Sequence, residues 1–430
     1  MTKHKISLTT AVLLSMNILI GSGIIVGPGQ IAAIAGNASF LAWPIIALLF
    51  LPLVLCTAQL SNMFPGCGGF YSYAKEGLNK KAGFVSGWLY IIGYTFAVSV
   101  DLLALRKTFI GVGINNFFTQ NVLVFNIILI TLSLLLNLLS FKTISRFLNS
   151  LTITKILPLV ILIILLPFII NPTFTVTSTE LSLIPYSLSL AIFGFFGFEY
   201  CCSLSHLIED PEKNAPKAIV IGFLITAALY TFFHFGLLNL MGAQNLGTNG
   251  AADFANYLSL PVPYLKTFLI FLIPIASILT IFAGMNGMLN ANSILLNSMA
   301  QENLFVSISP WLAKFNKNER PWTAIFAQCV IILIISTLTT NIDLVAALCN
   351  LGVFLAFIFP FASLLILQKR RKLHTKIALT FIAIITTLGF CVYSWLLLGG
   401  NMTERLMHTL PIIGALAFGY VLFLLSKNTK

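Results

Sequence analysis

The stretch MNILIGSGIIV, residues 16–26, places Gly21-Ser22-Gly23 in the middle of an apolar run of membrane-spanning length. The motif GFFGFE, residues 194–199, interrupts a second apolar run in the same way. Glycine loosens a helix, and in a bilayer every freed backbone group needs a partner, so a helix break survives only where it lines a cavity. Two breaks at corresponding positions in two halves of a chain indicate the substrate site of a transporter.

The composition is that of a polytopic membrane protein. Of 430 residues, 58% are hydrophobic and only 8% are charged, and the mean hydropathy is +0.98. Soluble proteins carry about 25% charged residues. Lys3-His4-Lys5 precedes the first apolar run, but no small-residue cleavage pattern follows, so the run is read as a span and not as a signal peptide.

The lengths of the apolar runs predict twelve membrane spans and leave no room for a soluble domain between them. The spans are expected at Thr9–Ala35, Phe40–Ser61, Gly83–Ile110, Val122–Ser140, Ile153–Ile170, Leu183–Leu204, Ala218–Met241, Tyr264–Met299, Trp322–Leu338, Ile342–Leu367, Ile377–Leu398 and Thr409–Leu425.

The basic residues predict the orientation of these spans. With twelve spans both termini share one side, and that side holds 19 Lys and Arg residues. The other side holds four, Arg106, Lys107, Lys266 and Arg405. By the positive-inside rule both termini are cytoplasmic, and the chain lies in the cytoplasmic membrane. The net charge of +12 is therefore a topology signal, and no nucleic-acid partner is expected.

The spacing of the two breaks predicts an internal repeat. They fall in spans one and six, five helices apart, so a second copy would enter the membrane from the opposite face. We therefore expect one transmembrane domain, 1–430, built from a first repeat at 1–182, an inverted second repeat at 183–368 and two appended helices at 369–430.

Unwound backbone at the breaks suits a zwitterion. Free N–H groups attract a carboxylate and free C=O groups attract an ammonium, and an amino acid carries both. The amides of residues 21–23 and the Ser22 hydroxyl would hold the carboxylate, and carbonyls near Leu19, Phe193 and Phe196 the amine. The alternative is that the glycines only permit close helix packing. The predicted substrate-binding residues are Leu19, Gly21, Ser22, Gly23, Ile24, Phe193, Gly194, Phe196 and Gly197.

Four motifs together resemble the amino acid–polyamine–organocation transporter superfamily, to which the amino acid permeases belong. They are GSGII (21–25) followed by Pro28, FGFFGFE (193–199), EDPEKNAPKAI (209–219) and PGCGGFY (65–71). The resemblance implies an all-α, leucine-transporter-like fold and transport of amino acids or related amines. Three positions depart from the pattern: Asp210 replaces the usual Asn, Gln59 a glutamate, and Phe193 the tryptophan of many exchangers for basic substrates.

Three ionisable residues within the spans are candidate coupling residues, because burying a charge in lipid is costly. The resemblance suggests that Lys155 takes the place of a sodium ion, as in sodium-independent members; otherwise it is a boundary lysine. Glu199 could carry a proton, accept hydrogen bonds or brace the second break. For Asp101 a structural pair with Arg106 or Lys107 is favoured over a coupling role.

The sequence thus predicts a secondary active transporter that moves amino acids by alternating access, in proton-coupled symport. The alternative is an amino acid or polyamine exchanger or exporter, and a non-transporting sensor or a channel is less favoured. No nucleotide-binding loop, nucleophile elbow or HExxH pattern occurs, so no enzyme and no cofactor are expected. The seven cysteines show no metal-ligand spacing, so no metal site is expected either.

Overall fold

The computed structural model describes residues 5–66, 68–170, 173–258, 263–372 and 374–427, and within them the regular elements are helices. Eight helical segments are long and apolar enough to cross a membrane, and three apolar helices are shorter. The main helices are α1 (Leu8–Leu19), α2 (Ser22–Ala35), α3 (Ala42–Met63), α5 (Lys80–Gly111), α7 (Val122–Asn137), α8 (Phe141–Ile169), α9 (Ser178–Gly194), α10 (Tyr200–Leu204), α11 (Pro211–Asn249), α12 (Pro263–Gln301), α14 (Trp322–Leu338), α15 (Ile342–Arg370), α16 (His374–Leu396) and α17 (Met402–Lys427).

Each predicted span coincides with one or two of these helices, but the starts of α8, α9, α11 and α17 were placed five or more residues too late. Helix α8 begins at Phe141, well before the predicted Ile153, because Ser140 accepts a hydrogen bond from the Thr143 amide and caps it. Helix α11 begins at Pro211, since proline suits a first helical position. Apolar length alone misses such polar first turns.

Both predicted breaks are present. Helix α1 ends at Leu19 and α2 starts at Ser22, with Gly21 in a non-helical conformation (φ −125°, ψ −143°). Helix α9 ends at Gly194 and α10 starts at Tyr200. Between them Gly197 has a φ of +106°, which only glycine adopts without strain.

The helices pack so that the two breaks lie together in the interior. Helix α2 packs on α9, α1 packs on α8, α11 and α12, and α5 packs between α12 and α15. Helices α16 and α17 are peripheral: α16 lies against α3 and α15, and α17 against α5. A chain of buried polar contacts fixes α16, because Thr380 donates to Gln368, which donates to Gln59 over 3.0 Å.

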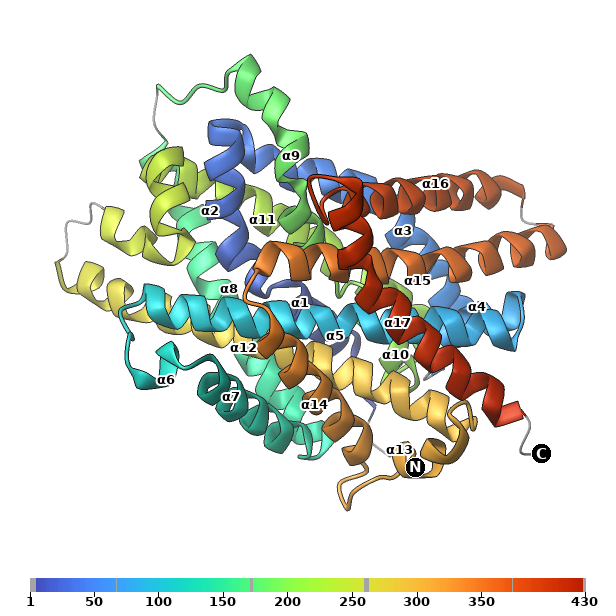
Figure 1. The fold of residues 1–430 in the computed structure, drawn as a ribbon. Coiled ribbons are helices and arrows are strands. Elements are labelled where there is room, and N and C mark those ends of the chain that lie inside the picture. Colours follow the sequence, from blue (N-terminus) through green and yellow to red (C-terminus); the bar gives the residue numbers. More distant parts are fainter. Residues whose placement is uncertain (1–4, 67, 171–172, 259–262, 373, 428–430) are drawn as a thin grey trace.

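The two ends of the bundle differ in their elements. One end carries the short helix α4 (Gly69–Gly77) and the joint between α15 and α16, and we call it the basic end, after Lys75 and the run 369–372 (Figure 1). The opposite end carries α6 (Phe117–Gln120) and η3 (Ala251–Tyr257) (Figure 1). The 3-10 helix η1 (Gly36–Leu41) joins α2 to α3.

Candidate functional site

The backbones of the two breaks touch directly. A Cβ atom on Gly23 would lie 2.5 Å from the Cα and 3.2 Å from the N of Gly194. One on Gly197 would lie 2.2 Å from Cγ2 of Ile18. Residues Ser22, Ile24, Phe193 and Phe196 are buried beside this contact. The structure therefore brings the predicted binding residues of both breaks into one place.

The ammonium of Lys155 closes the carbonyl end of α1. Its Nζ donates to the backbone oxygens of Asn17 over 2.5 Å and of Ile20 over 2.6 Å, and the side chain is 1% exposed. A cation at a helix C-terminus is favourable, because the carbonyls there lack intrahelical partners. Asn17 is itself held by Thr152 over 3.0 Å. Lys155 is therefore an interior residue at the first break and not a boundary lysine.

Asp101 does not form the ion pair that the sequence favoured. Its Oδ1 accepts a hydrogen bond from the Ser22 hydroxyl, and the side chain is fully buried. Arg106 instead donates to the carbonyls of Thr119 and Gln120, over 2.8 and 3.2 Å. Side chains five residues apart on a helix do not share a face, so Asp101 and Arg106 of α5 point to different neighbours. Lys107 is exposed and lines the cavities described below.

Glu199 is bonded to α5 and to its own loop. Its Oε1 accepts hydrogen bonds from the hydroxyls of Tyr94 and Tyr90, the latter over 3.1 Å, and its Oε2 accepts from the amide of Gly197 over 3.2 Å. Both carboxylate oxygens thus have protein donors. This arrangement fits the bracing alternative, because it connects the second break to a long helix.

Two carbonyls expected to face an amine already have partners. The Leu19 oxygen accepts from the Tyr230 hydroxyl, and the Phe193 oxygen accepts from the Phe196 amide over 3.2 Å. The Leu19 oxygen also accepts from the Gly21 amide over 2.9 Å, so both of its lone pairs are used, whereas one acceptor position remains on the Phe193 oxygen. Tyr230 was not predicted from the sequence. A tyrosine within an apolar helix is usual at a packed interface, and nothing in its spacing distinguishes it.

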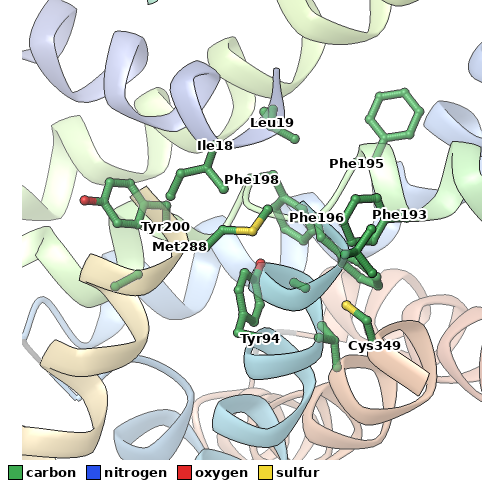
Figure 2. Packing of buried hydrophobic residues seen from close by; sticks show 14 of the residues in the cluster. Ile18, Leu19, Tyr94, Phe193, Phe195, Phe196, Phe198, Tyr200, Met288 and Cys349 are labelled. Carbon is green, nitrogen blue, oxygen red and sulfur yellow. The ribbon is translucent and has the colours of Figure 1, made fainter. Parts of the chain in front are cut away.

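Aromatic rings surround the second break. Phe193, Phe195, Phe196 and Phe198 are at most 2% exposed, and Phe50 of α3 contacts the last three at centroid distances of 5.9 to 6.1 Å. Figure 2 shows Phe193, Phe196 and Phe198 between Ile18 and Leu19 on one side and Tyr94 and Cys349 on the other. An apolar side chain of a substrate would find matching surface here.

Cavities approach the first break from the end opposite the basic end. One of about 650 Å³ is lined by α2, α5, α11, η3 and α12, and includes Ile25, one turn beyond Ser22. A second of about 390 Å³ adds Arg106 and Asp343 to its lining. Gln30 and Lys107 line both. The two cavities near the first break are therefore lined in part by polar and charged side chains.

The basic end is closed by two sets of contacts. Lys75 of α4 forms a 2.9 Å ion pair with Glu302, which also accepts a 2.5 Å hydrogen bond from Tyr71. Burial raises the pKa of Glu302, but the Lys75 and Tyr71 contacts outweigh it and hold that pKa below its ordinary value. In addition, the Ile6 amide donates to the Leu207 carbonyl over 2.8 Å, which ties the start of the chain to the segment after α10.

Arg320 was counted from the sequence as a basic residue of a cytoplasmic loop, yet it is 2% exposed. It donates to the Asn137 carbonyl over 3.0 Å and to the side chain of Asn290 over 2.6 Å, and Asn290 donates to the Tyr200 hydroxyl over 3.1 Å. This chain reaches α10 from the loop before α14. Arg320 stands among loop residues in the sequence, so its position did not indicate that it is buried.

Comparison with known proteins agrees with this architecture. The family model described as amino acid permease matches residues 6–418. The serine/threonine exchanger SteT of Bacillus subtilis is 27% identical over 86% of this chain and 84% of its own length. The L-methionine/branched-chain amino acid exporter YjeH of Escherichia coli is 25% identical over 93% and 95%. The probable agmatine/putrescine antiporter AguD of Lactococcus lactis is 27% identical over 63% and 59%. The chain belongs to the amino acid permease family.

Proposed function

We propose that this protein is a secondary active transporter that moves an amino acid across the cytoplasmic membrane by alternating access, coupled to a proton. Membership of a permease family makes it a transporter and not an enzyme. The observation that carries the finer proposal is the contact between the two helix breaks, with the Lys155 ammonium on the carbonyl end of the first. Membrane transporters place substrate and coupling groups at such interrupted helices.

The proposed topology has twelve spans, with five-span repeats in opposite orientation and α16 and α17 appended. Its support is the pairing of helices five spans apart: α2 with α9, α3 with α11, α5 with α12 and α7 with α14. We assign the basic end to the cytoplasm, because basic residues accumulate there. Both termini are then cytoplasmic. With Lys75 and Glu302 paired and the cavities at the other end, the described conformation is closed to the cytoplasm.

In the proposed binding mode the start of α2 holds the substrate carboxylate. Residues Gly21, Ser22 and Gly23 provide the amides, and the Ser22 hydroxyl provides one further donor. The Gly21 amide donates to the Leu19 carbonyl over 2.9 Å in the described conformation, so it must leave that carbonyl when it binds the carboxylate. The Phe193 and Phe196 carbonyls hold the ammonium, and the Leu19 carbonyl joins them when the Gly21 amide leaves it. The phenylalanines around the second break favour a neutral, mainly apolar side chain. Gly194 and Gly197 allow the two backbones to approach closely enough for one molecule to contact both.

Lys155 is the proposed coupling residue, with Glu199 and Asp101 as the other candidates. Its ammonium joins α8 to the α1 carbonyls, so loss of its proton would remove two charge-assisted hydrogen bonds from the first break. Deprotonation would therefore loosen α1 from α8 and favour opening towards the cytoplasm. A proton would then replace sodium as the driving ion.

Exchange is the alternative to symport that a specific observation favours. SteT is named as an exchanger and covers most of this chain, and YjeH is named as an exporter. An exchanger needs a substrate on the opposite side for each turnover, whereas a symporter needs only the ion gradient. The two mechanisms therefore differ in an experiment with empty and loaded vesicles.

The decisive experiment is uptake of radiolabelled serine, leucine and methionine into proteoliposomes, with putrescine and arginine as competitors. We expect accumulation driven by an inside-alkaline pH gradient in vesicles without internal amino acid. Lys155→Ala should lose this accumulation, and Lys155→Arg, which stays protonated, should bind substrate but not cycle. Uptake only into preloaded vesicles would establish exchange. Gradient-driven uptake by Lys155→Ala at the wild-type rate would remove Lys155 from coupling.

A further inference from the structure

We propose that Asp101 occupies the position at the first break that the substrate carboxylate takes, and that the substrate displaces it as Asp101 takes up a proton. This inference rests on the proposed function, because it needs an amino acid at the start of α2. The Asp101 carboxylate thus competes with the substrate carboxylate for the same hydrogen-bond donors.

The hydroxyl of Ser22 is already bonded to Asp101. This hydroxyl has one proton to give, and it donates that proton to Oδ1 of Asp101. The same carboxylate also faces the Ser22 backbone amide. These two groups are the donors at the start of α2 that suit an anion best. A substrate carboxylate cannot use the hydroxyl until Asp101 releases it.

The other oxygen of Asp101 lies in a different environment. Oδ2 is buried and has no hydrogen-bond partner within the part of the chain that the structure describes. Beside it lie two glycines: a Cβ atom on Gly284 would be 3.6 Å from Oδ2, and one on Gly21 would be 3.9 Å from it. Small residues from two elements therefore leave Asp101 room to move. Glu199, in contrast, has protein donors on both oxygens.

Charge repulsion links binding of the substrate carboxylate to protonation of Asp101. Two carboxylates that share one site do not both stay ionised, because their repulsion in a low-dielectric interior is large. A proton on Asp101 removes this repulsion and turns the group into an O–H donor, which the substrate carboxylate can accept. For each amino acid bound, one proton from the cavity at the end opposite the basic end is added to the Asp101 carboxylate. Binding of the carboxylate and of the proton are thereby linked.

The other ionisable groups around Asp101 do not supply this linkage by themselves. Those that interact with it electrostatically are Lys155 of α8, Tyr230 of α11 and Cys349 of α15. Lys155 is committed to the Asn17 and Ile20 carbonyls, and α2 and α12 present Ser22 and Gly284, which do not titrate. Asp101 is the group that the substrate carboxylate meets directly.

The test uses the purified full-length protein with L-serine, L-leucine and L-methionine, and with L-leucinamide as the analogue without a carboxylate. In wild type, affinity for the amino acids should rise by up to tenfold for each unit of pH lowered while Asp101 titrates. Asp101→Asn should bind them with affinity that no longer changes between pH 5.5 and 8, and at pH 8 more tightly than wild type. Glu404→Gln, a carboxylate outside the site, should keep the wild-type slope.

A second measurement needs no variant. In weakly buffered solution with a pH indicator, wild type should take up about one proton per bound L-leucine at pH 8. It should take up none with L-leucinamide.

Three results would overturn the inference while leaving the transport function intact: a wild-type slope in Asp101→Asn, loss of all amino acid binding by a folded Asp101→Asn, or binding of L-leucine without proton uptake. The second would mean that Asp101 attracts the substrate amine. If wild type neither binds nor transports any amino acid at any pH, the proposed function itself fails.

Discussion

Gly23→Ala should separate the two breaks, although it adds one methyl group. The new Cβ would lie 2.5 Å from Cα of Gly194, and ordinary contact begins at 3.4 Å, so the backbones must part by about 0.9 Å (3.4 minus 2.5). Neither side of this contact is a flexible side chain that could turn away. Overpacking of this kind costs about 1–3 kcal/mol. If the strain is relieved when the site loosens, substrate affinity falls by about 5- to 150-fold.

Gly27→Ala is the matched control, because Gly27 lies one turn further along α2. Its Cβ would lie 3.4 Å from Cη2 of Trp43, which is ordinary contact. We expect stability within about 1 kcal/mol of wild type, with a gain from helix propensity. Both variants are compared by thermal unfolding of the purified protein with and without the amino acid that wild type transports best. Equal midpoints and equal ligand stabilisation in the two variants would refute the claim that the breaks meet at Gly23.

Four further outcomes are expected. Phe193→Ala should weaken binding of a large apolar amino acid more than that of alanine, and equal losses in a competition assay would contradict the aromatic lining. Glu302→Gln should remove the ion pair that closes the basic end and raise cysteine-reagent labelling of a thiol placed at Ser205, a buried residue that donates to the Gly66 carbonyl near α4. In wild type the pKa of Glu302 in the folded protein lies below its ordinary value of 4.5, so the ion pair is intact above pH 4.5. The pair is lost as the pH falls through this lower pKa, and labelling should therefore rise only in acid. Arg320→Met should lower the unfolding temperature less than Arg320→Ala, because methionine keeps the packing of the buried stem.

The sequence predicted the breaks well because glycine marks them chemically. Glycine tolerates close approach and positive φ, and it can be identified directly in the sequence. Both breaks fall within the motifs quoted from the chain. It predicted the partners of the breaks poorly. Asp101 was assigned to Arg106 by nearness in sequence, yet the helix turns the two apart, and Ser22 becomes its partner across 79 positions of chain. Contacts between distant spans depend on helix rotation, which a hydropathy pattern does not encode.

The burial of Arg320 has little effect on the proposed orientation. Without it, the side proposed as cytoplasmic holds 18 basic residues instead of 19, against four on the other side, so the asymmetry on which the proposal rests remains.

The partners of the two breaks lead to a mechanical conclusion about α5. Asp101 of α5 meets the first break at Ser22, while Tyr90 and Tyr94 of the same helix meet the second at Glu199. The first break is held in addition by Lys155 of α8 and by a tyrosine of α11, and the second break accepts one more side-chain hydrogen bond, from Ser15 of α1 to the Phe198 carbonyl over 3.4 Å. Movement of the breaks against α5 must therefore exchange the hydrogen bonds of Asp101, Tyr90 and Tyr94. Because buried donors and acceptors left without partners are costly, such an exchange proceeds only when a substrate group or a proton takes the place of the bond that is lost.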